Sequence, residues 1–244
     1  MTEKLFYTDS HMQEFTAEVV SCRPCDNGYE AVLSRTAFFP EGGGQAADTG
    51  VIDGIRVYDV QEKGEQIFHY LEGELEEGKT VTGQIDWDKR FSRMQQHSGE
   101  HIVSGIVHAR FGYDNVGFHL NDELCTLDLS GPLTKEELRE VENAANEAVF
   151  ANVPVQISYP SKEKLKTLDY RSKIEIDGQV RIVTIPGYDV CACCAPHVYF
   201  TGEIGLIKLV QSQNYKGGIR ITMLCGVRAF SDYVRKEAQA KEIS

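Results

Sequence analysis

The chain has 244 residues, of which 41% are hydrophobic and 25% are charged, and its formal net charge at pH 7 is −12. This composition predicts a globular protein with one large domain or two modest ones. It argues against a membrane span, because no run approaches the roughly 20 apolar residues required. It also argues against sequence-blind binding along a nucleic-acid backbone, which needs a basic surface.

The N-terminal residues MTEKLFYTDSH lack the basic-then-apolar order of a signal peptide, so we expect a cytoplasmic protein. In that compartment the seven cysteines are expected to be thiols and metal ligands rather than disulfides. We expect Cys22 and Cys25 to be half-buried thiols in or beside a strand. Cys125 and Cys225 are expected to lie in the core.

Residues 4–86 are predicted to form short β-strands. Segments with alternating or β-branched and aromatic residues lie at 14–22, 29–39, 50–61, 66–72 and 80–86. The breaks between them, Asn27-Gly28, Gly42-Gly43-Gly44 and Asp53-Gly54, are typical of turns. Many short strands at this spacing predict a small β-barrel-like domain over residues 1–87.

From Trp87 onward the pattern becomes helical and then mixed. Helices are expected from about Lys89 to Arg110, over residues 134–152 with Thr134 and Glu137 in a capping box, and over 161–168. Strands are expected at 179–187, 198–213 and 218–226. This order predicts an α+β domain over residues 88–230, followed by a C-terminal tail at 231–244 that is a surface helix or frayed.

Two pairs of metal-binding residue types have i, i+4 spacing: His97 with His101, and Cys193 with His197. On a helix, this spacing puts two side chains on one face. Three imidazoles and a thiolate are ligands that Zn²⁺ takes in tetrahedral geometry, so we predict a zinc site made by these four residues. Cys193 is chosen over Cys194 and Cys191 for its offset to His197, although Cys191 could substitute in a loop.

The glycine-rich segment before Gln45, together with Thr36, is a candidate ligand-binding site. Gly42-Gly43-Gly44 allows positive φ and close backbone approach to a ligand. Gln45 can both donate and accept hydrogen bonds, and Thr36 carries a hydroxyl that can contact a serine side chain or bar a larger residue. From the residues alone, a tight turn with a solvated Gln45 remains the alternative.

Although the chain is acidic overall, several of its lysine and arginine residues are grouped in two regions. Between residues 162 and 173 they are Lys162, Lys164, Lys166, Arg171 and Lys173, and later ones are Lys208, Lys216 and Arg220. We expect a small basic face that holds an RNA end, with Arg220 contributing to substrate binding. A solvated face with acidic neighbours is the alternative.

The sequence resembles the editing domain of alanyl-tRNA synthetases over about residues 30–230. The matching motifs, in chain order, are RTAFFPEGGGQAADTG, the HSGEH histidine pair, GFHLNDELCTLDLSG, IPGYDVCACCAPHVYFTGEIGLIKLV and GGIRITMLCGVRAF. Because we recognise no ATP-binding or amino-acid-activation module, the resemblance is to the free-standing editing proteins of the AlaX type.

This resemblance implies an activity and a set of roles. Such relatives hydrolyse the ester of a wrongly attached amino acid, typically serine or glycine on alanine tRNA, which preserves the fidelity of translation. The chain is therefore expected to be a zinc-dependent aminoacyl-tRNA hydrolase whose partner is the acceptor end of mischarged tRNA. By the same resemblance, Thr36 and Gln45 are the expected catalytic residues and line the amino-acid pocket with Gly43 and Gly44.

The sequence departs from the family pattern at the metal motifs. The usual Cys-Gly-Gly-Thr-His is here Cys193-Cys194-Ala195-Pro196-His197, so both ends survive while the middle changes. We expect this chain to keep metal binding, while the changed loop residues can alter which amino acid it prefers as substrate. The usual His-Thr-x-x-His is here His97-Ser98-Gly99-Glu100-His101, and its altered positions are not ligands.

Three other functions compete with this one. A threonyl-type editing domain resembles the same zinc core, but the GGGQ segment favours the alanyl type. A module that binds the tRNA end, with a purely structural zinc, would protect the acceptor end without turnover. A generic zinc hydrolase of small esters is disfavoured because there is no HExxH motif, and Glu100 is expected to project away from the face shared by the histidines.

Overall fold

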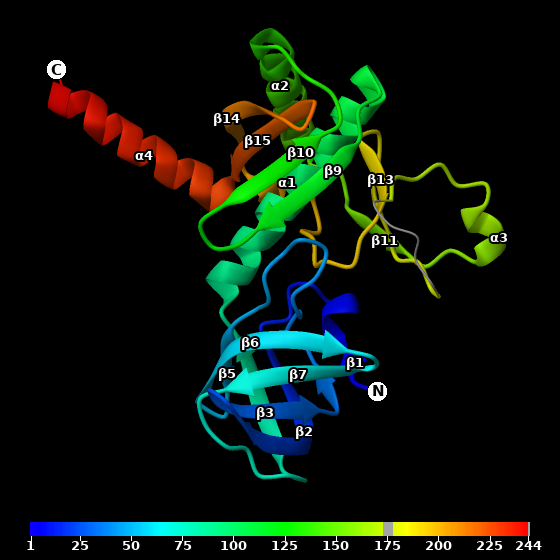
Figure 1. The fold of residues 1–244 in the computed structure, drawn as a ribbon, viewed down its shortest axis with the longest axis vertical. Coiled ribbons are helices and arrows are strands. Elements are labelled where there is room, and N and C mark those ends of the chain that lie inside the picture. Colours follow the sequence, from blue (N-terminus) through cyan, green and yellow to red (C-terminus); the bar gives the residue numbers. More distant parts are fainter. Residues whose placement is uncertain (173–177, 244) are drawn as a thin grey trace. The chain divides into compact units, whose positions relative to one another are not determined.

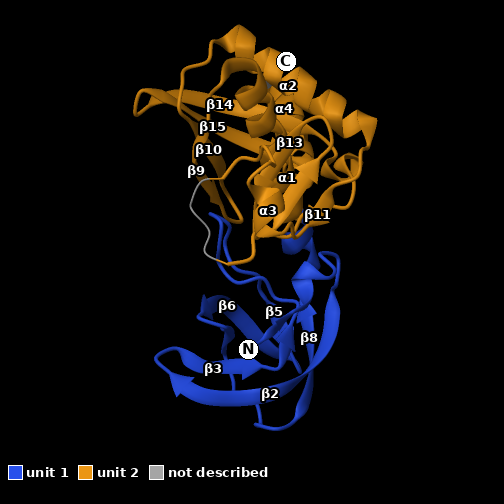
Figure 2. Cartoon of the chain, turned by 90° about the vertical axis from the view of Figure 1, so that its right-hand side faces the viewer, with its two compact units in different colours: residues 1–91 blue, residues 92–244 orange. Residues whose placement is uncertain are grey.

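The computed structural model describes residues 1–172 and 178–243 and has the mixed α+β character that the sequence predicts (Figure 1). It divides into two compact units, Met1–Phe91 and Ser92–Ser244 (Figure 2), which we describe one at a time. Among the described residues, no helix has the length and apolar character needed to cross a membrane.

The first unit is built around a closed β-barrel of six strands. Its strand order is β2-β3-β7-β6-β5-β8. The bounds are β2 Glu14–Cys25, β3 Gly28–Leu33, β5 Gly50–Ile52, β6 Ile55–Lys63, β7 Gln66–Leu71 and β8 Thr80–Ile85. The N-terminal β1 (Glu3–Lys4) pairs in parallel with β4 (Arg35–Thr36), and the short 3-10 helix η1 (Leu5–Tyr7) follows β1.

Period-2 alternation builds the barrel core. Along β2, Phe15, Ala17 and Val19 are buried while the residues between them are exposed. On β8, Gly83 makes room for the Phe15 ring, because a Cβ atom there would lie 2.4 Å from a Phe15 ring carbon. Cys22 and Cys25 are half-buried on β2, as predicted.

The second unit combines two antiparallel sheets with helices. The larger sheet has the order β14-β15-β10-β9 and the smaller one β11-β12-β13. The strands are β9 Asn115–Leu120, β10 Cys125–Leu129, β11 Gln156–Ser158, β12 Ile182–Ile185, β13 Asp189–Ala192, β14 Ile207–Tyr215 and β15 Gly218–Cys225. The helices are α1 Trp87–Phe111, which starts in the first unit, α2 Lys135–Ala151, α3 Lys162–Leu165, η2 Thr201–Ile204 and α4 Gly226–Ile243.

Helix α1 is the central element of this unit. Met94, Ile102 and Val103 are fully buried on it, as expected for a helix that packs on several sides. Cys125 and Cys225 are buried in the core, as predicted. Helix α2 begins with the predicted capping box between Thr134 and Glu137.

The structure corrects the predicted strand at residues 198–213 and decides between the two alternatives for the C-terminal tail. The prediction of one strand over residues 198–213 is wrong for its first half, where η2 forms and the strand begins only at Ile207. The Glu203 carboxylate accepts a hydrogen bond from the Phe200 N–H at 2.9 Å, and Gly205 turns the chain with a φ of 79°. The tail that we expected to be a surface helix or frayed forms most of α4, which extends away from the sheet (Figure 1).

Candidate metal centre

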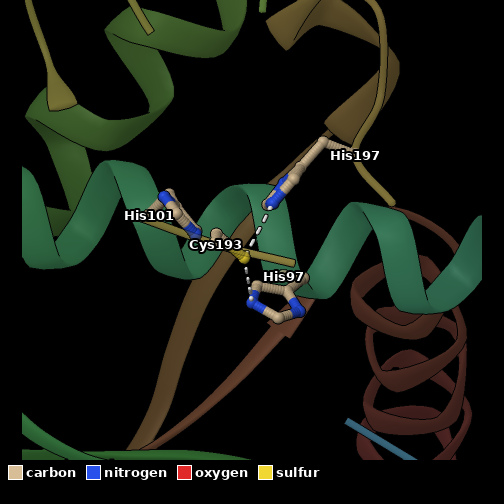
Figure 3. Close-up of side chains that lie close together, drawn as sticks. All are labelled: His97, His101, Cys193 and His197. Carbon is tan, nitrogen blue, oxygen red and sulfur yellow. Dashed lines mark hydrogen bonds between the residues drawn. The ribbon is translucent and has the colours of Figure 1, made fainter. Parts of the chain in front are cut away.

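Three imidazoles and one thiol converge inside the second unit (Figure 3). His97 and His101 lie one turn apart on α1, and Cys193 and His197 follow β13. All four potential ligand atoms lie within 4.8 Å of one another. The Cys193 Sγ atom lies 3.5 Å from His97 Nε2 and 3.4 Å from His197 Nε2.

The cluster fits a tetrahedral metal ion by its spacing and its chemistry. In a tetrahedral zinc site, a nitrogen and a sulfur ligand lie about 3.6 Å apart, close to the two sulfur–nitrogen distances here. Burial alone raises the pKa of the Cys193 thiol, but the imidazoles of His97 and His197 help to hold that pKa well below its ordinary value. The thiolate is the form that binds metals.

The route by which Cys193 and His197 converge differs from the predicted one. The i, i+4 argument assumed a helix, which is wrong for this pair, because residues 193–199 form a loop. A buried side chain shapes that loop: the Arg181 Nη1 donates to the carbonyl oxygens of Cys193 at 2.8 Å and Ala195 at 3.0 Å. The Ala195 N–H also points to the Cys193 sulfur at 3.4 Å.

Two imidazoles are oriented by partners outside the cluster. His101 Nδ1 lies 2.8 Å from Asp189 Oδ2, and His197 Nδ1 lies 3.0 Å from Ser98 Oγ. When Nδ1 carries the hydrogen, Nε2 has a free lone pair, so both contacts turn Nε2 toward a metal. Asp189 also belongs to a second close group with His101 and Cys191.

Glu100 lies outside the cluster, as its position on the helix predicted. Its carboxylate accepts hydrogen bonds from Ser104 and Asn115 in the core. Glu100 is therefore engaged in packing α1 against β9.

The backbone just before β13 lies against α1 at Gly105, where only a glycine fits without a shift. A Cβ atom at Gly105 would lie 2.2 Å from the Tyr188 carbonyl oxygen, directly before Asp189. We therefore expect Gly105→Ala to displace this backbone and to lower the free energy of unfolding by about 1–3 kcal/mol, with weaker metal binding. Denaturant unfolding and metal titration measure both effects.

The control for that substitution is Gly73→Ala. At Gly73, a new Cβ atom would first meet the Cγ2 methyl of Ile55 at 3.3 Å, and a side chain can move more easily than a backbone. We expect a change in stability within about 0.5 kcal/mol there. Equal effects of the two substitutions would contradict the role assigned to Gly105.

In the first unit, the glycine-rich segment forms a tight turn. Gly42 and Gln45 exchange backbone hydrogen bonds of 3.1 and 3.0 Å, and Gly43 and Gly44 have φ values of 60° and 82°. The Gln45 side chain is fully buried, which differs from the solvated alternative. The glycines are required by these positive φ values.

Thr36 has a buried partner that the sequence did not indicate. Its hydroxyl lies 2.8 Å from Nε2 of His69, and the Phe38 N–H donates to the same hydroxyl at 3.1 Å. Burial lowers the pKa of His69 to about 4, so the imidazole is neutral at pH 7. Because His69 Nδ1 faces the Ala31 carbonyl at 3.2 Å, Nδ1 carries the hydrogen and Nε2 accepts the one from Thr36.

Only some cations of the expected basic face are exposed and not paired with a carboxylate in a way that would keep them from RNA. Arg220 donates two hydrogen bonds to Asp128 and lies 3.9 Å above the Tyr215 ring, so its charge is already paired. Arg171 pairs with buried Asp189 instead of facing solvent. Lys162 and Lys164 are exposed on α3, and Lys173 lies outside the described residues.

Comparison with known proteins shows which proteins the chain is similar to. Residues 180–222 match the model described as "Threonyl and Alanyl tRNA synthetase second additional domain", and residues 3–89 match "tRNA synthetases class II (A)". The alanyl-tRNA editing protein AlaX-L of Pyrococcus horikoshii is 34% identical over 241 residues, which cover 95% of this chain. Over nearly its whole length, the chain is thus similar to alanyl-tRNA editing proteins.

Other proteins are similar to this chain at comparable sequence identity. The alanyl-tRNA editing protein Aarsd1 of Rattus norvegicus is 31% identical over 97% of this chain. An alanine--tRNA ligase of Ignicoccus hospitalis is 34% identical over the whole chain. The chain spans 60% of the length of AlaX-L, 62% of Aarsd1 and 28% of the ligase.

Proposed function

We propose that this protein hydrolyses the ester bond of mischarged alanine tRNA, releasing serine or glycine, at a zinc centre made by His97, His101, Cys193 and His197. The observation that carries the proposal is the largely buried cluster of three imidazoles and one thiol, with the spacing of a tetrahedral site, in a chain similar to alanyl-tRNA editing proteins. The expected partner is the acceptor end of the tRNA, and the expected compartment is the cytoplasm.

In the proposed reaction, the protein orients the water and the ester and provides a positive charge near the reacting oxygen. A water oxygen forms a bond to the ester carbonyl carbon, the bond to the ribose oxygen breaks, and a proton passes to that oxygen. A bound Zn²⁺ would supply a positive charge for an oxygen of the substrate or of the water. The four side chains would hold it, while Asp189 and Ser98 keep two of the imidazoles in place.

Thr36 and Gln45 are proposed to form the amino-acid pocket, with Gly43 and Gly44 shaping its wall. The Thr36 hydroxyl donates its hydrogen to His69 and receives one from the Phe38 N–H. It therefore retains acceptor capacity only, which suits the hydroxyl of a serine as donor. Arg220, already paired with Asp128, is proposed to contact the RNA through its remaining donors.

Deacylation of separately charged tRNAs tests the proposed function. Alanine tRNA carrying serine, glycine or alanine is incubated with the protein, and the released amino acid is measured. We expect release of serine or glycine and retention of alanine. Equal release of all three amino acids would contradict editing.

The four-ligand set also favours a second candidate, a tRNA-end binding module with a structural metal, because structural zinc sites are commonly closed by four protein ligands. In the same assay, this candidate predicts protection of the acceptor end without release of any amino acid. Turnover of the serine or glycine ester would eliminate it.

Thr36→Val is expected to slow hydrolysis of the serine ester about tenfold and to leave the glycine ester nearly unchanged. Valine keeps the shape and removes the hydroxyl, and the loss of one hydrogen bond worth about 1.4 kcal/mol corresponds to a tenfold change in rate. Thr36→Ser keeps the hydroxyl and is the matched control. Equal slowing of both esters by Thr36→Val would show a structural effect in place of recognition.

A further inference from the structure

The His101 imidazole is held by a buried carboxylate. His101 Nδ1 lies 2.8 Å from Asp189 Oδ2, and the two side chains are only 3% and 1% exposed. A hydrogen on Nδ1 is the arrangement that this contact favours, and it leaves Nε2 able to bind a metal. Without Asp189, the ring could rotate or carry its hydrogen on the wrong nitrogen.

Asp189 is in turn held by Arg171. The Arg171 Nε donates to Asp189 Oδ1 at 2.8 Å, so the two carboxylate oxygens serve two different partners. The Arg171 side chain is 14% exposed, so water screens this ion pair only weakly. The carboxylate is thus fixed in position on both sides.

The Arg171 backbone is fastened to the strand that carries Asp189. Its N–H donates to the Val190 carbonyl at 2.8 Å, and its carbonyl accepts from the Ala192 N–H at 2.9 Å. The same strand leads directly to Cys193. Strand β13 therefore carries Asp189, which orients His101, and leads to the candidate ligand Cys193. Backbone hydrogen bonds to the same strand hold Arg171 beside Asp189.

We propose that Asp189 and Arg171 are positioning residues of the metal centre: Asp189 keeps Nε2 of His101 directed at the metal, and Arg171 keeps Asp189 in place. The inference rests on the proposed metal function of the four-residue cluster. It assigns to Arg171 a role in the metal centre in place of the expected role in an RNA-binding face.

Metal affinity and release test this inference. Apoprotein is titrated with Zn²⁺ against a chromophoric chelator, and Zn²⁺ release is timed after excess chelator is added. We expect Asp189→Asn to weaken Zn²⁺ binding about 10- to 100-fold, the usual cost of losing a residue that supports a metal ligand. Arg171→Gln is expected to speed release several-fold, and Asp189→Glu to restore part of the affinity.

The matched control is Asp122→Asn, which removes a carboxylate paired with Arg93 at 2.6 Å in the same unit. We expect wild-type Zn²⁺ affinity in this variant. The Co²⁺-substituted protein gives an independent readout, because its visible absorption reports ligand geometry and is expected to change only in the Asp189 and Arg171 variants. Circular dichroism of each apoprotein checks the fold.

The possible outcomes are distinct. Wild-type Zn²⁺ affinity and release in Asp189→Asn and Arg171→Gln would overturn this inference while leaving the metal centre intact. If Asp189→Asn does not fold, Arg171→Gln decides alone, because it keeps the carboxylate beside His101. A wild-type protein that does not bind Zn²⁺ would overturn the proposed metal function, and this inference with it.

Discussion

Cys193→Ala is expected to abolish both bound metal and ester hydrolysis. The Cys193 sulfur is the common neighbour of the cluster, 3.5 Å from His97 Nε2 and 3.4 Å from His197 Nε2. As a thiolate, it also supplies a negative charge that partly offsets the charge of a divalent cation, which the neutral imidazoles do not. Removing it should reduce activity by more than the roughly 10- to 100-fold cost of losing a supporting residue.

Elemental analysis of zinc and serine-ester deacylation, measured on the same preparation, check this expectation. Cys194→Ala is the matched control, because it removes the adjacent half-buried thiol, which lies outside the four-residue cluster. We expect this control to keep its zinc. Stoichiometric zinc in Cys193→Ala, or its loss in Cys194→Ala, would show that the sulfur ligand is assigned wrongly.

The two halves of the candidate metal centre were predictable to different degrees. His97 and His101 lie on a helix, where a regular period of 3.6 residues links sequence spacing to direction in space. Cys193 and His197 lie in a loop, whose path depends on Arg181, a residue twelve positions before Cys193. Local spacing contains no information on such a contact, and the convergence of Cys193 and His197 was predicted by a helical argument that does not apply to this loop.

Residues that support the site were harder to find from the sequence than its candidate ligands. Asp189 lies 88 positions from His101, and His69 lies 33 positions from Thr36. Each pair is joined by tertiary packing, and a single buried aspartate or histidine has no distinctive local pattern. The alternation of Asp189 and Cys191 on β13 was an available signal, since alternate residues on a strand share a face, and both side chains lie close to His101.

Strand alternation made the strands of the first unit predictable, while the connections between them were not. Residues 37–39 were included in a predicted strand, yet β4 ends at Thr36. A buried arginine holds this stretch: Arg90 donates to the Ala37 carbonyl at 2.6 Å, and its partner Asp48 accepts from the Phe39 N–H at 2.8 Å. The backbone here therefore bonds to side chains in place of a neighbouring strand.

That arrangement makes Arg90→Met the substitution with the largest expected effect on stability. Arg90 and Asp48 form an ion pair with both side chains fully buried, and Arg90 also donates to the Ser10 carbonyl at 3.0 Å. Removing the cation leaves a buried carboxylate without its counter-charge, which costs about 3–5 kcal/mol. The substitution should also loosen the turn that contains Gln45.

Fluorescence of the single tryptophan, Trp87, measures this effect, because Trp87 belongs to the first unit and stacks on Phe91 at 5.4 Å. Arg56→Met is the control: its 3.4 Å pair with Glu72 is more than half exposed, so its loss should cost under about 1 kcal/mol. The double variant Arg90→Met/Asp48→Asn keeps an acceptor for the Phe39 N–H and removes the buried charge. It should therefore be more stable than Arg90→Met alone, and a further loss of stability would show that the charge of Asp48 is not the cause.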